Sequence, residues 1–266
     1  MDEPVPAGPA TLRRQVSDLG HEVGRVSLLA GETVRFMGAG VRQYGLVVSQ
    51  MNAIGVRSLL LVVIVSLFTG AVAAVQAAYQ FSSVVPLKYI GSVIMRSVII
   101  ELGPVLTALI VGGRVGASIA AELGTMRVTE QVDALEAMGI PPVRYLVVPR
   151  VVAAVVMLPV LTMLADAIAV FGGYVVSVTS IGVSSHSYVA ALKEFFLARD
   201  LVSGLVKSVF FGAVISGMGC YHGFRAEGGA EGVGAATTRA VVSSCVLILV
   251  IDYVLANVLF RFIFAS

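Results

Sequence analysis

Ionisable side chains interrupt segments of this 266-residue chain that are otherwise apolar. Glu101, Lys207 and Asp252 each stand inside such a segment, and Arg239 lies at the edge of one. A charge at the centre of a membrane costs about 2.5–3.5 kcal/mol, so each of these groups should face protein or water. They can serve as a polar gate or form structural ion pairs, and we favour ion pairs. The expected partners for the carboxylates, including Asp166 in a further apolar segment, are Lys207, Arg96 and Arg239.

No arrangement for metal binding or for the use of ATP is visible. His21, His186 and His222 lie far apart, with no cluster of Cys or carboxylates beside them, so no metal site is expected. The glycine-rich stretch at 228–234 lacks the Lys and the Ser or Thr of a phosphate-binding loop, and the pattern of that loop occurs nowhere else. We therefore expect no cofactor and no catalytic residue in this chain.

The composition identifies the apolar segments as membrane helices. Hydrophobic residues make up 58% of the chain and charged residues 13%, whereas a soluble domain has about 25% charged residues. Disorder is excluded by the scarcity of charge, and a disulfide scaffold by the presence of only two cysteines. A net charge of +2 gives no reason to expect nucleic acid as a partner. Because the apolar runs are continuous rather than alternating, an all-α integral membrane protein is predicted.

Five segments are long enough to cross a bilayer, which requires about 20 apolar residues. They cover approximately residues 58–80, 89–113, 151–179, 201–224 and 240–264. The N-terminal region and the loops on its side of the membrane carry twelve Lys and Arg residues, and the segments on the opposite side carry four. Since cytoplasmic loops retain positive charge, we predict a cytoplasmic N-terminus and a C-terminus on the outer side.

The N-terminal region divides into two parts. Residues 1–10 are rich in proline and are expected to be a disordered tail, and residues 11–266 to form a single domain. Over residues 11–52, apolar side chains recur at roughly helical spacing. This pattern predicts a helix that lies in the cytoplasmic membrane interface, or a solvated helix that packs on the protein.

The loop between the second and third spans contains a short amphipathic helix, over about residues 129–139. Thr129 is its expected N-cap, Gly139 its expected C-cap, and two prolines then prevent its continuation. An apolar stripe is formed by Val128, Val132, Leu135 and Met138, and the acidic residues off this stripe are Glu130, Asp133 and Glu136. Anionic headgroups repel an acidic face, so this face is expected to bind a protein.

Residues 101–142, which read ELGPVLTALIVGGRVGASIAAELGTMRVTEQVDALEAMGIPP, resemble the signature of the MlaE/YrbE permeases. These are the membrane subunits of ABC transporters that move lipids together with MCE-domain partners. The similarity continues through KSVFFG at 207–212 and ATTRAVV at 236–242, and it covers roughly residues 50–260. Family members typically have Arg directly before the Glu at position 101. Ile100 stands there in this chain, which favours Lys207 as the partner of Glu101.

The resemblance implies roles for particular residues. The helix at 129–139 would be the coupling helix that docks on a separate ATPase, which binds ATP and Mg, and its contact residues would be Glu130, Asp133, Glu136 and Gly139. The lipid cavity would be lined by Gln76, Gln80, Phe81, Val84 and Leu102. Five spans enclose little space, so a homodimer around a shared cavity is expected.

The function implied is the transfer of phospholipids, or related lipids, between the bacterial inner membrane and a periplasmic MCE-domain partner. One alternative is an ion- or proton-coupled secondary transporter in which Glu101 and Asp252 titrate, which predicts internal repeats that we do not find in the sequence. A second alternative is a non-transporting scaffold for envelope assembly. In such a scaffold, changes at Glu136 or Gly139 would leave activity intact.

Overall fold

The computed structural model describes residues 9–40, 43–81 and 89–261, and within these ranges it contains helices but no strand. Five helical stretches are long and apolar enough to cross a membrane. They are Tyr44–Gln80, Ile90–Val128, Val143–Thr179, Ala198–Gly223 and Gly229–Leu259. The predicted all-α membrane protein with five spans is therefore confirmed. All five stretches are longer than the predicted spans, most of all the first three, whose helices continue past the apolar segments.

Several of the long stretches are built from shorter elements. The first consists of α2 (Tyr44–Ile54), η1 (Val56–Ser58) and α3 (Leu59–Phe81). The second consists of α4 (Ile90–Ser97), the π turn η3 (Val98–Leu102), α5 (Gly103–Val111), the π turn η4 (Gly112–Gly116) and α6 (Ala117–Val128). The third joins the π turn η5 (Val143–Val147) to α8 (Val148–Thr179), and the last two are α10 (Ala198–Gly223) and α11 (Gly229–Leu259).

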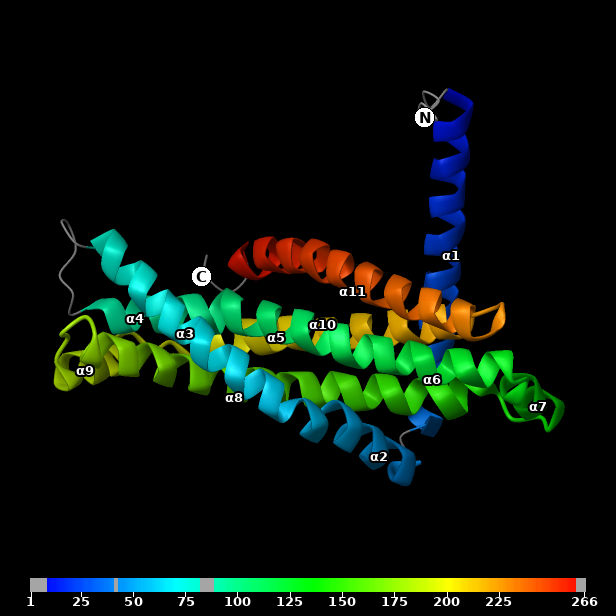
Figure 1. Ribbon diagram of the computed structural model, residues 1–266, viewed down its shortest axis with the longest axis horizontal. Helices are drawn as coiled ribbons and strands as arrows, with labels where there is room; N and C mark the ends of the chain where they lie inside the picture. Colours follow the sequence, from blue (N-terminus) through cyan, green and yellow to red (C-terminus); the bar gives the residue numbers. More distant parts are fainter. Residues whose placement is uncertain (1–8, 41–42, 82–88, 262–266) are drawn as a thin grey trace.

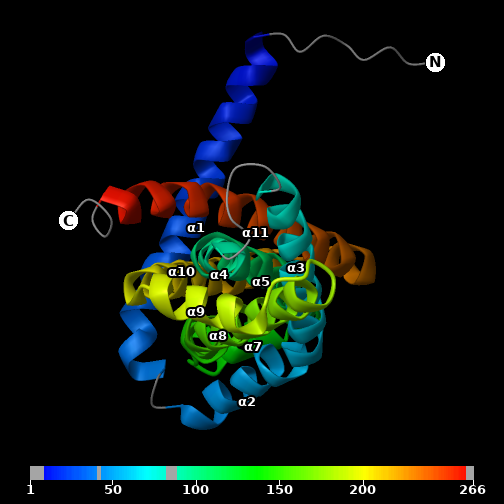
Figure 2. The same cartoon turned by 90° about the vertical axis from the view of Figure 1, so that its left-hand side faces the viewer.

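The spans lie side by side along the long axis of the molecule (Figure 1). The short helix α7 (Gln131–Ala137) lies at one end of the bundle, and α9 (Ser185–Phe195) lies at the other. Within the bundle, α8 packs along both α3 and α10, as the end-on view shows (Figure 2). A Cβ atom at Gly70 of α3 would overlap the carbonyl of Ala169 in α8, so these two helices approach to backbone contact.

Small residues also join the second span to the fourth. A Cβ atom at Gly219 of α10 would lie 3.1 Å from the carbonyl oxygen of Gly116, and one at Gly112 would lie 3.4 Å from the side chain of Ile215. Gly113 and Gly217, in contrast, have nothing within 4 Å of such an atom. The glycines that lie in contact therefore pack helices of the same chain together.

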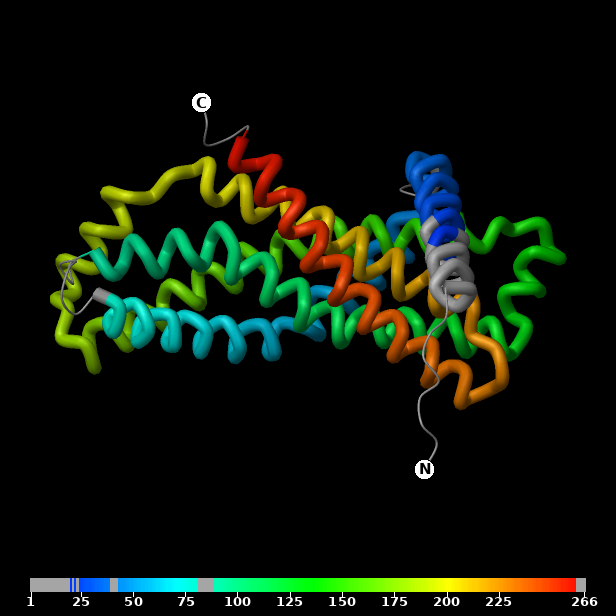
Figure 3. Tube along the Cα trace, turned by 90° about the horizontal axis from the view of Figure 1, so that it is seen from above, coloured from blue at the N-terminus to red at the C-terminus, as the bar shows by residue number. Residues whose placement is uncertain are grey.

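Helix α1 (Pro9–Gly40) runs across the direction of the spans, at the end of the bundle that carries α7 (Figure 1). In the view from above, α1 is seen nearly end-on (Figure 3). It contacts η5, α8 and α10. This orientation agrees with a helix that lies parallel to a membrane surface. Residues 9 and 10 of the expected tail belong to this helix, and residues 1–8 lie outside the described part of the chain.

Candidate functional site

Three helices bring an ionic cluster together inside the bundle. The Nζ atom of Lys207 lies 2.6 Å from Oε1 of Glu101 and 3.0 Å from Oδ1 of Asp252. The Lys207 side chain is only 1% exposed, whereas that of Asp252 is 19% exposed and that of Glu101 is 43% exposed. One buried cation therefore joins η3, α10 and α11. The geometry confirms Lys207 as the partner of both carboxylates.

A π turn positions the carboxylate of this cluster that is most exposed. Glu101 stands within η3, two residues before Gly103 and three before Pro104, which begin α5. Proline has no N–H to donate to the preceding turn, and a π turn changes the hydrogen-bond register at that point. The structure thus has an irregular backbone just before Pro104, in the form of a π turn. Such turns are frequent at functional sites.

The other arginines considered as partners lie elsewhere. Arg96 binds Asp200 instead, with 3.0 Å between Nε and Oδ2, and the Asp200 side chain is 3% exposed. Arg239 stands thirteen residues before Asp252 on α11, which corresponds to about 20 Å along a helix. The suggestion that Arg239 pairs with Asp252 or Glu101 is therefore wrong. The pair between Arg96 and Asp200 was not predicted, because the two residues lie 104 positions apart in the sequence.

Asp166 is also placed differently from the prediction. It lies buried on α8, and neither oxygen of its carboxylate has a hydrogen-bond partner among the described residues. One oxygen occupies the space that a Cβ atom would take at Gly103. The expected ion pair of Asp166 is thus not found in the described part of the chain, where its carboxylate packs against Gly103 of the second span.

The residues expected to line one lipid cavity lie in two places on a single chain. Leu102 lines a narrow apolar cleft between α3, α5 and α8. Gln76 borders an open hollow of about 450 Å³ on the outer side of α3, lined mainly by Val72, Val75 and Val176. Gln80 is exposed on the same helix. The side chain of Phe81 and the whole of Val84 lie outside the described part of the chain.

Helix α7 forms the tip of the molecule at the end that carries α1 (Figure 1). Val132 is buried, whereas Glu130 and Glu136 are exposed. Asp133 forms an ion pair with Arg127 of α6, so its charge is partly compensated. The apolar stripe is shorter than predicted, because Met138 is 66% exposed.

The ends of α7 are defined by two left-handed residues. Glu130, with φ of 59°, reverses the chain at the start of the helix. The expected N-cap at Thr129 is wrong, because its hydroxyl donates instead to the carbonyl of Thr125 in α6. Gly139 has φ of +74°, and Ile140 N–H donates to the carbonyl of Leu135 at 3.0 Å. The predicted glycine C-cap is therefore confirmed.

A second ion pair supports this tip from inside the bundle. Arg150 of α8 is buried, and its Nη2 lies 2.8 Å from Oε1 of Glu122 on α6. The Nη1 atom of Arg150 also donates to the carbonyl of Leu146 at 2.7 Å. The pair with Glu122 joins α6 to α8, the helices between which α7 is held, whereas the bond to Leu146 stays within the third span. This pair was not predicted, because both residues were taken as parts of a loop.

The sequence of this chain is similar to those of known membrane permeases. A family model described as "Permease MlaE" matches residues 47–258. A probable ABC transporter permease protein of Rickettsia typhi is 45% identical over 216 residues, which cover 81% of this chain and 83% of the relative. The intermembrane phospholipid transport system permease protein MlaE of Haemophilus influenzae is 32% identical over 252 residues, which cover 94% of this chain and 97% of that protein.

Proposed function

The chain belongs to the MlaE permease family, and from this premise we propose that it is the membrane subunit of an ABC transporter for phospholipids or related lipids. The transporter would move lipid between the bacterial inner membrane and a periplasmic MCE-domain partner. A separate ATPase subunit, which binds ATP and Mg, would drive the transfer. The chain itself makes and breaks no covalent bond in this scheme.

The observation that carries the proposal is the position of α7. This helix projects from the bundle with Glu130 and Glu136 exposed, while its buried Val132 and its ion pair with Arg127 attach it to the second span. A protein that binds this tip can therefore push directly on α6 and, through the pair of Arg150 with Glu122, on α8. We infer that the ATPase docks here, at the end of the molecule that faces the cytoplasm.

The apolar surface of the spans supports a lipid as substrate. Along α3, the cleft at Leu102 and the hollow at Gln76 have apolar walls. Acyl chains are accommodated by such walls, whereas a sugar or an ion requires a polar lining. The hollow at Gln76 is open on one side of a single chain, so we propose that two copies face each other and enclose a common cavity. The partly exposed Glu101 would then mark the polar end of that cavity.

The test is to purify the full chain with its co-encoded neighbours and to measure ATP hydrolysis with and without phospholipid. We expect an ATPase subunit to copurify, and we expect its hydrolysis to increase when lipid is added. Lipid transfer to the MCE-domain partner should require hydrolysable ATP. Transfer that persists without ATP, in a preparation that contains no ATPase, would exclude the ABC mechanism. That result would favour the secondary transporter in which Glu101 and Asp252 titrate.

A further inference from the structure

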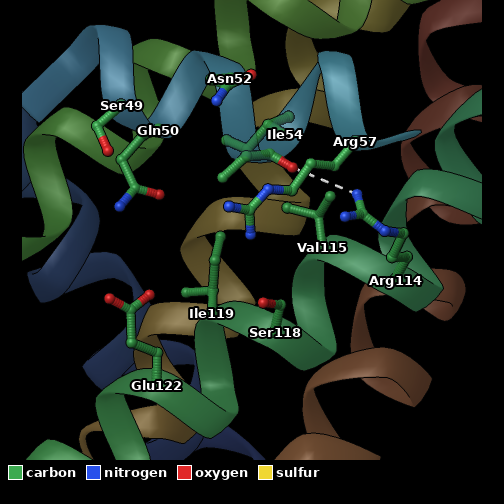
Figure 4. A pocket seen from close by; sticks show the side chains of 11 residues that line it. Ser49, Gln50, Asn52, Ile54, Arg57, Arg114, Val115, Ser118, Ile119 and Glu122 are labelled. Atoms are coloured by element: carbon green, nitrogen blue, oxygen red, sulfur yellow. Dashed lines mark hydrogen bonds between the residues drawn. The ribbon is translucent and has the colours of Figure 1, made fainter. Parts of the chain in front are cut away.

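A polar pocket of about 310 Å³ lies between α2 and α6, close to the end of the bundle that carries α7 (Figure 4). This volume falls at the lower end of the range of about 300–1,000 Å³ that is typical of small-molecule sites. The polar side chains that matter here are Gln50 from α2, Arg57 from η1, Arg114 from η4, and Ser118 and Glu122 from α6. None of them belongs to the ionic cluster of Lys207 or to the cleft at Leu102.

The two arginines of this pocket are held in different ways. Arg114 is half-buried, and its Nη1 donates to the carbonyl of Ala53 at 3.3 Å and to the hydroxyl of Ser58 at 2.6 Å. These bonds fix its guanidinium beside η1, the turn that connects α2 to α3 in the first span. Arg57 is exposed, and its guanidinium points into the pocket (Figure 4). The ion pairs found among the described residues do not include Arg57.

The charge of the lining is positive. Glu122 is the acidic residue of the lining, and Arg150 already binds its carboxylate at 2.8 Å. Arg57 and Arg114 therefore have no compensating carboxylate in the wall. Gln50 and Ser118 add neutral polar groups to the same wall (Figure 4). A phosphate group matches this arrangement, because guanidinium groups bind its oxygens through paired, charge-assisted hydrogen bonds.

The position of the pocket along the bundle favours a lipid over a free anion as its ligand. Arg57 directly precedes the charge-free run of α3, and Arg114 follows the apolar run of α5, so both arginines stand where the apolar part of the bundle ends. Phospholipid phosphates lie at this level of a bilayer. On α3, exposed apolar side chains follow Arg57 at helical spacing, namely Leu60, Ile64 and Phe68. An acyl chain can lie along this strip, which a free phosphate would not use.

We propose that this pocket binds the phosphate headgroup of an anionic phospholipid of the cytoplasmic leaflet, at a site distinct from the transport path. Arg57 and Arg114 hold the phosphate oxygens, Gln50 and Ser118 bond to the remaining polar atoms, and the acyl chains lie along α3. Basic pockets between membrane helices are suited to such headgroups. The proposal rests on the cytoplasmic placement of the α7 end, but on no step of the transport cycle.

The test places a photoreactive benzoyl-phenylalanine at position 49, where the exposed Ser49 lines the pocket but has no role in holding the headgroup. The full chain is reconstituted in vesicles of equal amounts of phosphatidylcholine and phosphatidylglycerol and then illuminated, and adducts are identified by mass. We expect phosphatidylglycerol adducts in excess. Arg57→Gln should reduce them about tenfold, because a charge-assisted contact to phosphate is lost. The control Arg144→Gln, which removes an exposed arginine of η5 outside the pocket, should leave them unchanged.

Three results would overturn the proposal: equal adducts of the two lipids, adducts that persist in Arg57→Gln, or adducts that inorganic phosphate abolishes. The last result would assign the pocket to a free anion. Thermal unfolding of both variants shows whether the fold is kept, which we expect because Arg57 and Arg144 are exposed. The crosslink is measured without an ATPase, so a failure of lipid-stimulated hydrolysis would affect the transport proposal alone.

Discussion

Lys207 is a nearly inaccessible cation that two carboxylates share, so its removal leaves Glu101 and Asp252 without a counter-charge. We expect Lys207→Met to destabilise the protein by about 3–5 kcal/mol, the typical effect of removing one partner of a buried ion pair. Glu101→Gln should cost less, because the pair of Lys207 with Asp252 remains. Thermal unfolding in detergent measures both variants. Lys193→Met, on the exposed surface of α9, is the control. Equal stability of the Lys207 and Lys193 variants would contradict the structural role of the cluster.

The contact between Gly103 and Asp166 predicts a second effect at the level of single residues. A methyl group at Gly103 would overlap the carboxylate of Asp166, so Gly103→Ala should destabilise the protein by about 1–3 kcal/mol through overpacking. Asp166→Ala in the same chain should restore much of this loss, because it removes the overlapping atoms. Thermal unfolding of the two single variants and the double variant forms a complete cycle. Strictly additive effects would show that the two residues are not in contact.

At the level of elements, α7 offers a direct test of docking. Glu136 is exposed and has no ion pair among the described residues, whereas Asp133 is bound to Arg127. Glu136→Lys is therefore the cleaner change, since it alters the outer face without breaking a contact within the chain. We expect at least a tenfold weaker association with the ATPase, measured by copurification, and loss of lipid-stimulated hydrolysis. Glu194→Lys on α9, at the opposite end of the molecule, should have no effect.

The elements were largely predictable from the sequence, and their irregularities were not. Long apolar runs with few charges predicted five spans, and Gly139 followed by two prolines predicted the end of α7. The π turn at Glu101 was missed, because the hydrogen-bond register of a helix leaves no simple periodic signal. The start of α7 was assigned to Thr129 because its side chain suits an N-cap. The structure uses that hydroxyl to end α6 instead.

The ionic contacts were likewise only partly predictable from the sequence. The unfavourable free energy of a charge in a membrane predicted that Glu101 and Asp252 would be paired, and Lys207 was the central cation available to both. The pair of Arg96 with Asp200 joins residues 104 positions apart, and their packing depends on how α4 meets α10. Asp166 has no such partner among the described residues, and its carboxylate fills the space beside Gly103. Such outcomes depend on three-dimensional packing, which one sequence does not encode in a local pattern.

At the scale of the whole molecule, α7 and α9 lie at opposite ends of the bundle (Figure 1), so one must face the cytoplasm if the chain spans the membrane. The excess of Lys and Arg at the α7 end predicts that α7 is cytoplasmic. We expect a membrane-impermeant maleimide to label His186→Cys on α9 in intact spheroplasts. Ala137→Cys on α7 should be labelled only after lysis. Both positions are exposed, and the natural cysteines Cys220 and Cys245 are first replaced by serine.

The labelling pattern decides more than the direction of threading, because both the docking helix and the proposed headgroup pocket lie at the α7 end. If position 137 is protected in spheroplasts, a cytoplasmic ATPase can reach Glu136, and Arg57 stands at the leaflet where anionic lipids attract basic groups. Labelling of position 137 before lysis, with protection of position 186, would place α7 outside the cell. ATP-driven docking at α7 would then be impossible, whatever lipid the spans carry. Detergent-solubilised protein, in which both cysteines should react, verifies that each site is chemically accessible.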